Sequence, residues 1–337
     1  MPTLYLVEQG AMVECDGERL TVRRHETELN SIPIVKIDEI VVIGVVGFTT
    51  PSLKRLLDRS IPTTFLTIHG RYQGRLVGSI SAHPHLRRAQ YRRADDSAWA
   101  FRQARSHVDG KLRNCKVLLQ RFCRNRSNPP EAAQQAADGM DDLIERVQRV
   151  TQHSSLLGLE GSGTARYFGG VRALLGDGAG FERRERRPPN DPVNSLLSLG
   201  YTLLLGRVLG AVETVGFDPY QGYLHLCDPR RPALALDLME EFRPLLVDAY
   251  VIRCLSEGSI GEADFERNEE NQLRLSSEGL RRFVRGFDER LRMEALHPDG
   301  AEGRPGKVSY LRCIELQARR LARAVLGEGE YEAFIVR

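Results

Sequence analysis

The segment PVNSLLSLGYTLLLGRVLGAVETVG, residues 192–216, is the most apolar long stretch of this 337-residue chain. Apolar side chains recur along it at intervals of three to four positions, which is the spacing of an α-helix. A helix that is apolar on most of its surface has to be covered by other elements. We therefore expect this segment to form a helix at the centre of a helical core.

The first eighty residues are instead typical of β-strands. The step DGER at Asp16–Arg19 predicts a hairpin turn, and Thr50 and Pro51 predict the start of one short helix, SLKRLLDRS. Glycine, proline and aspartate separate the predicted strands, which are short and rich in valine and isoleucine. These segments are LYLVEQG, AMVECDG, RLTVRR, IPIVKI, EIVVIG, TTFLTI and GRLVG.

After residues 83–86 the spacing of apolar residues becomes helical for most of the remaining chain. A chain of this length also makes two domains the expectation. We predict an α+β fold, in which a small N-terminal β-rich domain, residues 1–85, precedes a larger all-α domain, residues 86–337. Within the second domain, Pro244 should kink or divide a helix, and residues 295–306 should form a mobile loop.

The composition is that of an ordinary soluble globular protein, with 41% hydrophobic and 28% charged residues. The net charge of +3 does not by itself imply a nucleic-acid partner. Several arginines nevertheless fall in clusters, which are either solvated helix faces or a surface for phosphate groups. The clusters are Arg87, Arg88, Arg92 and Arg93; Arg183, Arg184, Arg186 and Arg187; and Arg281, Arg282 and Arg285.

The six cysteines show no CxxC spacing, so we expect reduced thiols and neither a disulfide frame nor a zinc site. The N-terminus lacks the basic and apolar regions of a signal peptide. No apolar run is expected to reach the roughly 20 residues that cross a bilayer. These features predict a cytoplasmic protein without a membrane partner.

Acidic residues gather in the phrase LALDLMEEFRP, where Asp237 lies three and four positions before Glu240 and Glu241. In a helix these carboxylates share a face and repel each other unless a cation offsets their charge. A metal ion or Arg243 would supply that charge. The alternative is a solvated acidic patch.

Two further residues could join such a site. His225 lies in GYLH, in a short extended segment, and Glu160 lies at the edge of the apolar stripe of LLGLEG. Each has a plain alternative. A lone histidine among apolar residues is more often a core histidine than a ligand, and the alternative for Glu160 is a helix-terminal carboxylate paired with Arg166. Two carboxylates and an imidazole suit a divalent ion such as Mg²⁺ or Mn²⁺. Spacing alone does not bring these positions together.

Four phrases carry a family resemblance. They are LLGLEGSGTARYF, RRPPNDPVNSLLSLGYTLLLG, PYQGYLHLCDPRRPALALDLMEEFRP and LRCIELQARRLARAV, in this order within residues 150–325. They resemble the CRISPR-associated spacer-acquisition integrases, the first of the two universal adaptation proteins. The plan of a small β domain before a larger helical one is also similar to that family.

The resemblance implies a metal-dependent DNA endonuclease and integrase whose ligands are Glu160, His225 and Glu240. In that family a 3′-hydroxyl of a short captured DNA attacks a phosphodiester of the CRISPR repeat, in antiviral defence. Asp237 matches a neighbouring acidic position of the family, where it would either support one of the ligands through a hydrogen bond or serve as an alternate ligand. Asn194, Tyr201 and Arg243 fall in phrases that line the family's site, and their roles are left open.

The resemblance also implies partners. These are a second copy of the chain in an asymmetric homodimer, double-stranded DNA from the captured fragment and the repeat, a small ferredoxin-like adaptation protein and, as an optional partner, an end-trimming nuclease. Seven arginines are the expected contacts to DNA phosphates: Arg87, Arg88, Arg92, Arg183, Arg184, Arg186 and Arg187. Tyr91 beside them is either a core tyrosine or a residue that stacks on a splayed DNA end.

Two rival functions remain open at this point. The chain could be a non-catalytic DNA-binding scaffold of a nucleic-acid-processing complex, with a merely structural acidic cluster. It could also be a small-molecule metallohydrolase, although neither a glycine-rich phosphate loop nor an HExxH string occurs.

Overall fold

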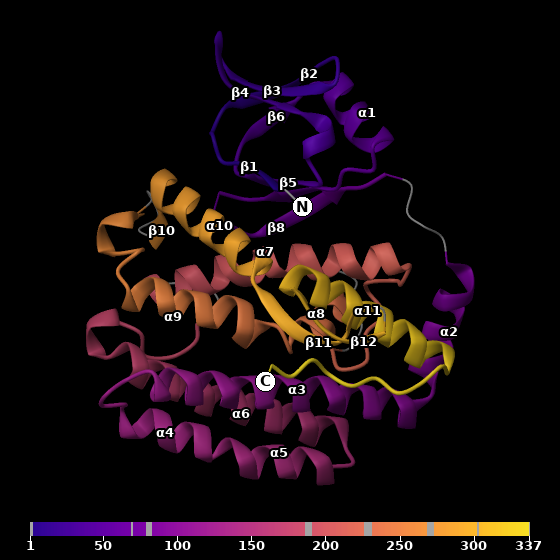
Figure 1. Cartoon of the computed structure of the whole chain (residues 1–337), viewed down its shortest axis with the longest axis vertical. Helices are drawn as coiled ribbons and strands as arrows, with labels where there is room; N and C mark the ends of the chain where they lie inside the picture. Colours follow the sequence, from indigo (N-terminus) through magenta and orange to yellow (C-terminus); the bar gives the residue numbers. More distant parts are fainter. Residues whose placement is uncertain are drawn as a thin grey trace.

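The computed structural model describes residues 3–68, 70–78, 83–185, 191–225, 231–267, 273–301 and 303–336. Two of the predicted DNA contacts, Arg186 and Arg187, lie outside these residues. Strands dominate the first part of the chain and helices the rest, as Figure 1 shows. The first part comprises β1 (Thr3–Leu6), β2 (Ala11–Asp16), β3 (Arg19–Arg24), β4 (Thr27–Pro33), η1 (Ile34–Lys36), β5 (Glu39–Ile43), β6 (Val46–Phe48), α1 (Thr50–Asp58), β7 (Thr63–Leu66) and β8 (Tyr72–Leu76).

The second part is mainly helical, which agrees with the expected change of character. Its helices are α2 (Pro84–Asp95), α3 (Ser97–Arg124), α4 (Glu131–Asp138), α5 (Met140–Arg149), α6 (His153–Leu175), η2 (Asp177–Ala179), α7 (Pro192–Val215), α8 (Ala233–Met239), the π-helix η3 (Arg243–Asp248), α9 (Ala249–Ser256), η4 (Glu262–Asp264), α10 (Ser277–Arg292) and α11 (Tyr310–Leu326). Its strands are β9 (Phe265–Arg267), β10 (Leu273–Leu275), β11 (Glu294–Ala301) and β12 (Arg304–Ser309).

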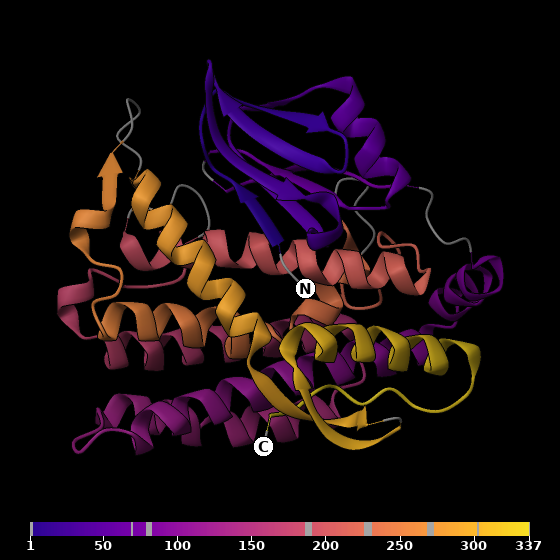
Figure 2. The same cartoon turned by 45° about the horizontal axis from the view of Figure 1, so that its top comes forward.

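The N-terminal strands form two four-stranded sheets, in the orders β1-β5-β7-β8 and β4-β3-β2-β6. The apolar run of β5 explains how the sheets stack. Ile40 and Val42 belong to a core shared with the second sheet, whereas Val41 and Ile43 belong to the core of the helical part. Because side chains alternate along a strand, a strand covered on both faces has to be apolar throughout. Figure 2 shows the first sheet lying over α7.

The central position predicted for residues 192–216 is confirmed by α7. Most of its leucines are buried in the main core, and Gly200 allows a close approach, since a Cβ there would lie 2.6 Å from Val247 Cγ1. The expectation that no segment is apolar enough to cross a bilayer is wrong for this helix. Among the described residues, the helix Pro192–Val215 is long and apolar enough to cross a bilayer, judged by length and composition alone. However, 61% of its most apolar window is buried inside the structure. Packing in the core therefore accounts for its apolar character.

The prediction of an all-α second part needs correction, because two antiparallel hairpins, β9–β10 and β11–β12, lie within it. The expected mobile loop at residues 295–306 is the hairpin β11–β12, whose turn contains Gly303 with a φ of +81°. Its glycines and prolines suggested a loop, yet backbone pairing with a neighbour produces strands from such a sequence. His297 of β11 is fully buried, which gives the hairpin a fixed place on the core.

Smaller differences concern element ends. The helix α1 is capped by Thr49, whose side chain accepts from the backbone of Ser52, rather than by Thr50. The segment IPIVKI is half strand and half 3₁₀-helix, since β4 ends at Pro33 and η1 begins at Ile34. The turn at Asp16–Arg19 is confirmed by the antiparallel pairing of β2 with β3. The expected division at Pro244 is also observed, because η3 separates α8 from α9 there.

Candidate functional site

Two carboxylates from different elements meet at one lysine. Glu160 lies on α6 and Glu240 follows the last residue of α8, and both contact the ammonium group of Lys111 on α3. The Nζ atom forms an ion pair with Glu160 Oε1 and another, at 2.7 Å, with Glu240 Oε2. The side chain of Lys111 is only 10% exposed. Three elements that are distant in sequence thus place opposite charges at one buried point.

Packing explains why α6 brings Glu160 to this point. Gly163 lies one turn further along the same helix face, and a Cβ there would lie 2.4 Å from Leu112 Cδ2 of α3. Leu112 is fully buried and has little room to move. The missing side chain at Gly163 therefore permits the short distance between the two helices, and Glu160 reaches Lys111 as a consequence.

The charges that meet around Lys111 shift the pKa values of the side chains there. Burial alone would raise the pKa of Glu240, but the charges of Arg243, Lys111 and His225 lower it to about 2. Burial would lower the pKa of Lys111, yet Glu240 and Glu160 raise it above its ordinary value. The lysine is therefore cationic and Glu240 anionic at neutral pH. Arg243 adds a second cation, with its Nε 3.0 Å from Glu240 Oε1.

His225 is oriented by a fully buried carboxylate. Oδ1 of Asp237 lies 2.7 Å from the ring nitrogen Nδ1 and accepts the backbone N–H of His225 at 2.9 Å. Oδ2 of the same residue accepts the N–H groups of Tyr223 and Leu224 at 2.6 and 2.9 Å. Gly222 makes this approach possible, because a Cβ there would lie 2.8 Å from Asp237 Oδ2.

Burial would lower the pKa of His225, but the hydrogen bond and the charge of Asp237 raise it. With Nδ1 held by Asp237, the other ring nitrogen, Nε2, is the one left to bind a ligand. Asp237 thus holds both the backbone and the ring of His225 in place.

The three predicted ligands are therefore brought together only in part. Glu160 and Glu240 share one ammonium group, and His225 lies close enough for its charge to lower the pKa of Glu240. In the described part of the chain, however, no three acidic, histidine or cysteine side chains converge as a metal-ligand group. The cation at the centre of the two carboxylates is Lys111, which the sequence reasoning did not single out.

A second cluster adjoins the first through Arg243. The guanidinium groups of Arg243 and Arg184 lie over the ring of Tyr201, at 4.8 and 5.3 Å from its centroid. The Tyr201 hydroxyl donates to Asp248 Oδ1 at 2.6 Å, and the Tyr167 hydroxyl donates to Oδ2 at 2.9 Å. Burial raises the pKa of Asp248 to about 6, although the two tyrosine hydrogen bonds lower it. Two of the three residues whose roles had been left open, Arg243 and Tyr201, are thus in direct contact.

The third of those residues, Asn194, fixes the segment before α7. Its side chain accepts from Arg184 at 2.8 Å and from the backbone of Glu185 at 2.9 Å, and it donates to Arg183 O at 2.9 Å. Asp191, the N-cap of α7, accepts from both nitrogens of Asn194. Asn194 is buried and acts by holding the arginine-rich segment against the helix.

The predicted phosphate contacts differ in how available they are. Arg183 is exposed over 81% of its side chain, apart from an ion pair with Glu185. Arg184 is half-buried against Tyr201 and Ser198, which makes it part of the site and not a free surface charge. Arg88 and Arg92 are exposed on α2, whereas Arg87 donates to Gly216 O at 3.1 Å.

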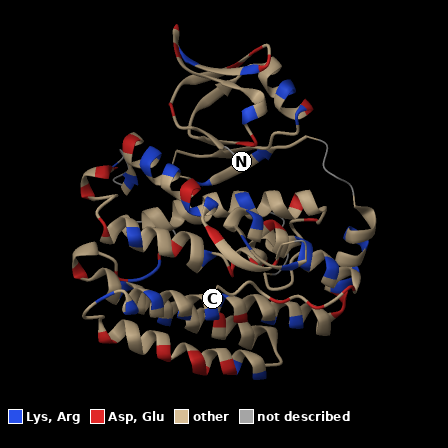
Figure 3. Ribbon diagram, viewed as in Figure 1, with Lys and Arg blue, Asp and Glu red and all other residues tan. Residues whose placement is uncertain are grey.

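The core interpretation of Tyr91 is wrong, because this residue is 47% exposed and its hydroxyl contacts Asp218. Figure 3 shows basic and acidic residues intermixed in this view, so no single-sign face stands out there. A groove of about 790 Å³ next to Glu160 is lined by basic residues, Arg172, Arg183 and Arg184, and also by the acidic residues Asp177 and Glu182.

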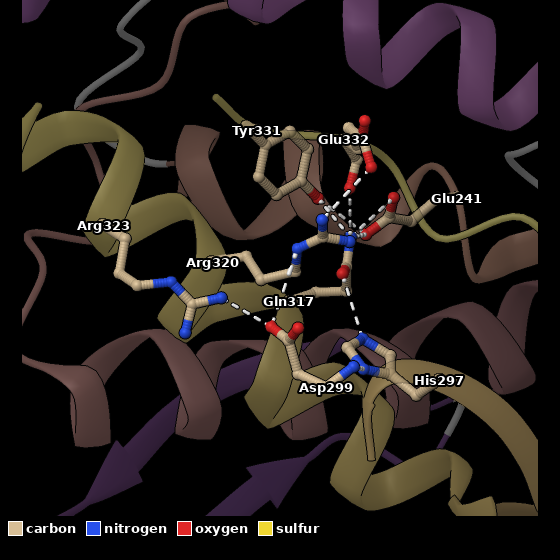
Figure 4. A network of polar contacts seen from close by, with 8 residues as sticks. All are labelled: Glu241, His297, Asp299, Gln317, Arg320, Arg323, Tyr331 and Glu332. Carbon is tan, nitrogen blue, oxygen red and sulfur yellow. Dashed lines mark hydrogen bonds and ion pairs between the residues drawn. The ribbon is translucent and has the colours of Figure 1, made fainter. Parts of the chain in front are cut away.

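Behind Glu240, the adjacent Glu241 points into a second buried network, drawn in Figure 4. Its Oε1 accepts from the Tyr331 hydroxyl at 2.8 Å and from Gln317 Nε2 at 3.1 Å, and its Oε2 accepts from Phe334 N at 2.6 Å. Burial raises the pKa of Glu241 to about 7 against these hydrogen bonds. The network fixes the closing segment, which we define as Tyr331–Val336.

Sequence reasoning missed Lys111, Asp248 and the partners of Glu241. Lys111 belongs to a long helix rich in arginine and glutamine, where one more basic residue gives no signal. Asp248 lies eight residues after Glu240, in a mostly apolar segment that has the pattern of a core helix and gives no sign of a polar site. Only contacts between distant elements identify these residues, and spacing within one element does not contain that information.

The family model for CRISPR associated protein Cas1 matches residues 4–289 of the chain. A relative from Thermus thermophilus, CRISPR-associated endonuclease Cas1 1, is 38% identical over 332 residues, which cover 98% of each chain. A relative from Geobacter sulfurreducens, a CRISPR-associated exonuclease Cas4/endonuclease Cas1 fusion, is 34% identical over 341 residues. That match covers 99% of this chain but 60% of the fusion, so the chain spans about three fifths of this relative's length.

Solved structures share the fold. A chain of a Cas6-RT-Cas1–Cas2 complex is 28% identical with a TM-score of 0.84, over 99% of this chain and 36% of that one. A Cas1 protein from Thermotoga maritima has a TM-score of 0.84 at 24% identity, over 99% and 100% of the two chains. A casposase bound to its integration product has a TM-score of 0.86 at 24% identity, over 98% and 92%. The last two likenesses concern the fold alone.

Proposed function

Because the chain belongs to the Cas1 family of CRISPR-associated proteins, we propose that it is a metal-dependent DNA endonuclease and integrase. It inserts short DNA fragments into a CRISPR array by attack of a 3′-hydroxyl on a phosphodiester. The observation that carries the proposal is the meeting of Glu160 and Glu240 at one cationic nitrogen, with His225 nearby and oriented by Asp237.

The donor set fits a hard divalent ion. Two carboxylates that already share a cation, and an imidazole with one nitrogen held by a buried carboxylate, are the ligands that Mg²⁺ or Mn²⁺ accepts. Glu160, Glu240 and His225 Nε2 would hold it. When bound, the ion would polarise the phosphoryl oxygens and stabilise charge on the leaving oxygen.

The protein's own residues would prepare this site. Asp237 keeps the Nδ1 proton of His225 in place, so that Nε2 faces outward as a lone-pair donor. Arg243 sets the rotamer of Glu240 through their ion pair. The groove beside Glu160 has room for a DNA backbone, and the exposed Arg183 at its edge would neutralise a phosphate without reading the base.

Partners form part of the proposal. A solved complex of a similar chain includes Cas2, and a relative is fused to the exonuclease Cas4. We therefore include the small ferredoxin-like adaptation protein and an end-trimming nuclease among the proposed partners, together with double-stranded DNA and a second copy of this chain. The proposed location is the cytoplasm.

The test is half-site integration of a labelled oligonucleotide into a supercoiled plasmid that carries a CRISPR repeat, with Mn²⁺ or with chelator. Glu160→Ala and His225→Ala should each lower metal-dependent strand transfer by at least about 100-fold. Glu145→Ala on α5, an exposed glutamate paired with Arg149, is the matched control and should retain activity. DNA affinity, measured by gel shift, should change little in all three variants.

Full strand-transfer activity in either site variant would remove that residue from the proposed ligands. The alternative function, a non-catalytic DNA-binding scaffold, is favoured by one observation. Lys111 and Arg243 already balance the charges of Glu160 and Glu240, as a purely structural ion-pair cluster would require. DNA binding without any metal-dependent cutting or joining would support that scaffold.

A further inference from the structure

Lys111 holds a position that the proposed function leaves unexplained. Its ammonium contacts both Glu160 and Glu240, which lie on different elements and are the only acidic ligands in the proposal. A lysine that served solubility or DNA binding would extend to the surface. The Lys111 side chain instead points inward and is 10% exposed. Its charge is therefore directed at the two carboxylates and not at solvent.

The backbone that carries Lys111 is fixed on both sides. Val108 and Leu112, its neighbours on α3, are fully buried. Asn114, one turn further on, donates to Glu241 O at 2.8 Å and to Phe334 O at 2.7 Å. The helix thus cannot withdraw from the site without breaking buried contacts. Only the flexible side chain of Lys111 can move.

The charges of the two carboxylates proposed as ligands are already balanced. Glu160 and Glu240 supply two negative charges, and Lys111 and Arg243 supply two positive ones, with side-chain exposures between 5% and 25%. A divalent cation that enters such a site meets repulsion from a buried ammonium within contact distance of the same carboxylates. In a partly buried region this repulsion is weakly screened.

We propose that Lys111 is a positioning residue that serves as the resident counter-ion of the carboxylate pair. It holds Glu160 and Glu240 at one point, and a divalent cation binds only by displacing its ammonium group. The inference rests on the proposed function, because it concerns the same site. Lys111 thereby sets a lower affinity for the metal than the two carboxylates and the histidine would have without it.

The experiment measures binding of Mn²⁺ by the loss of the free-ion EPR signal, without DNA or turnover. Lys111→Met and Lys111→Gln remove the positive charge, and each should tighten Mn²⁺ binding by at least about tenfold. Lys116→Met is the matched control, since Lys116 lies on the same helix but contacts a different carboxylate. Its Nζ atom lies 2.5 Å from Oδ1 of Asp141, which is not part of the site. The control should bind Mn²⁺ like the unaltered protein.

The direction of the change separates this role from ordinary structural support. A lysine that only stabilised the fold would leave a disordered site and weaker metal binding when replaced. Circular dichroism identifies the folded variants, and Lys111→Gln, which keeps a hydrogen-bond donor, decides the matter if Lys111→Met does not fold. Unchanged or weaker binding in a folded neutral variant overturns the inference.

The same titration distinguishes this failure from failure of the proposed function. If the unaltered protein has no Mn²⁺ site that Glu160→Gln abolishes, the metal-dependent function is wrong and the counter-ion role falls with it. If that site exists and neither neutral variant binds Mn²⁺ more tightly, only the role of Lys111 is wrong.

Discussion

The carboxylate of Asp237 controls a site without being one of its proposed ligands. It is fully buried, yet it accepts three backbone N–H groups from the loop Tyr223–His225 and contacts the His225 ring. Each of these bonds offsets part of the cost of burying the charge. The loop and the imidazole are thereby fixed by a single side chain, so the orientation of His225 depends on Asp237.

Asp237→Asn keeps the size of this side chain but replaces one acceptor oxygen by a donor nitrogen. One backbone or ring contact must then be lost, and His225 should lose its fixed orientation. We expect Mn²⁺ affinity to fall about 10- to 100-fold, the usual cost of removing such a support. EPR titration measures it, with Asp141→Asn, an exposed aspartate on α5, as control. An affinity equal to that of the unaltered protein would show that Asp237 does not orient a ligand.

Asp248 should make stability depend on pH. Burial raises its pKa to about 6 in the folded protein, from an unfolded value of 3.8. A raised folded pKa means that the contribution to stability is complete below pH 3.8 and is lost as the pH rises through about 6. The free energy of unfolding of the unaltered protein, relative to Asp248→Asn, should fall by on the order of 2–3 kcal/mol between about pH 4 and pH 7. Urea denaturation over that range measures the difference, and a constant difference would contradict it.

At the scale of single residues, the sequence predicted which residues belong to the candidate site better than it predicted the contacts between them. The phrases around Glu160, His225 and Glu240 pointed to residues that do lie near one another. Lys111 was missed because nothing in its own neighbourhood marks it. Its partners lie on α6 and after α8, and a contact between such distant positions follows from packing that local spacing does not record.

At the scale of elements, α3 is the support of the whole site. It carries Lys111 toward the carboxylates and Asn114 toward the closing segment, where Asn114 also accepts from Val336 N at 3.1 Å. The closing segment has no regular secondary structure, so its backbone groups depend on such side chains for hydrogen bonds. Side chains from α3 and α11, together with Glu241, provide them.

Tyr331→Phe removes one hydroxyl from this network, so that Glu241 Oε1 loses one of its donors and Gln317 Nε2 loses one of its acceptors. We expect a loss of about 1–3 kcal/mol in the free energy of unfolding. Glu332→Gln, the next residue and 77% exposed, is the matched control and should change it by less than about 0.5 kcal/mol. Urea denaturation compares the two. Equal stabilities would mean that the hydroxyl is already solvated.

The helices and strands that could be predicted were those whose own apolar residues follow a clear pattern. The helix α7 followed from its apolar spacing, and β5 followed from its run of valine and isoleucine. The hairpin β11–β12 was missed because its pairing partner, and not its composition, determines the strand. The π-helix η3 could be anticipated only as a break at Pro244, since its backbone pattern depends on how α8 and α9 pack.

At the scale of the molecule, buried ion pairs join the N-terminal sheets to the helical part. Arg207 of α7 pairs with Glu39 of β5 and donates to Thr3 and Tyr5 of β1, at 2.8 and 2.9 Å. Arg75 of β8 pairs with Glu213 of α7 at 2.6 Å. Figure 2 shows α7 beneath this sheet. The only arginine within the apolar helix α7 is therefore, together with Glu213, a residue that ties this helix to the strands.

Arg207→Met should destabilise the protein by about 3–5 kcal/mol, because Glu39 would remain buried without a compensating charge. Arg55→Met is the control, since Arg55 forms an exposed pair with Glu18 at 3.2 Å and should cost less than about 1 kcal/mol. Thermal unfolding measures both. A melting temperature for Arg207→Met equal to that of the control would show that water replaces the lost partner.

The closing segment has a consequence for how the protein is made. Helix α3 leaves the ribosome long before Tyr331 and Phe334, yet Asn114 and Glu241 each obtain part of their hydrogen bonds from those late residues. A nascent chain that has not yet reached residue 331 therefore lacks two of the donors that hold the Glu241 carboxylate, Tyr331 Oη and Phe334 N. Newly synthesised protein would complete the buried network around Glu241 only after translation has passed this point.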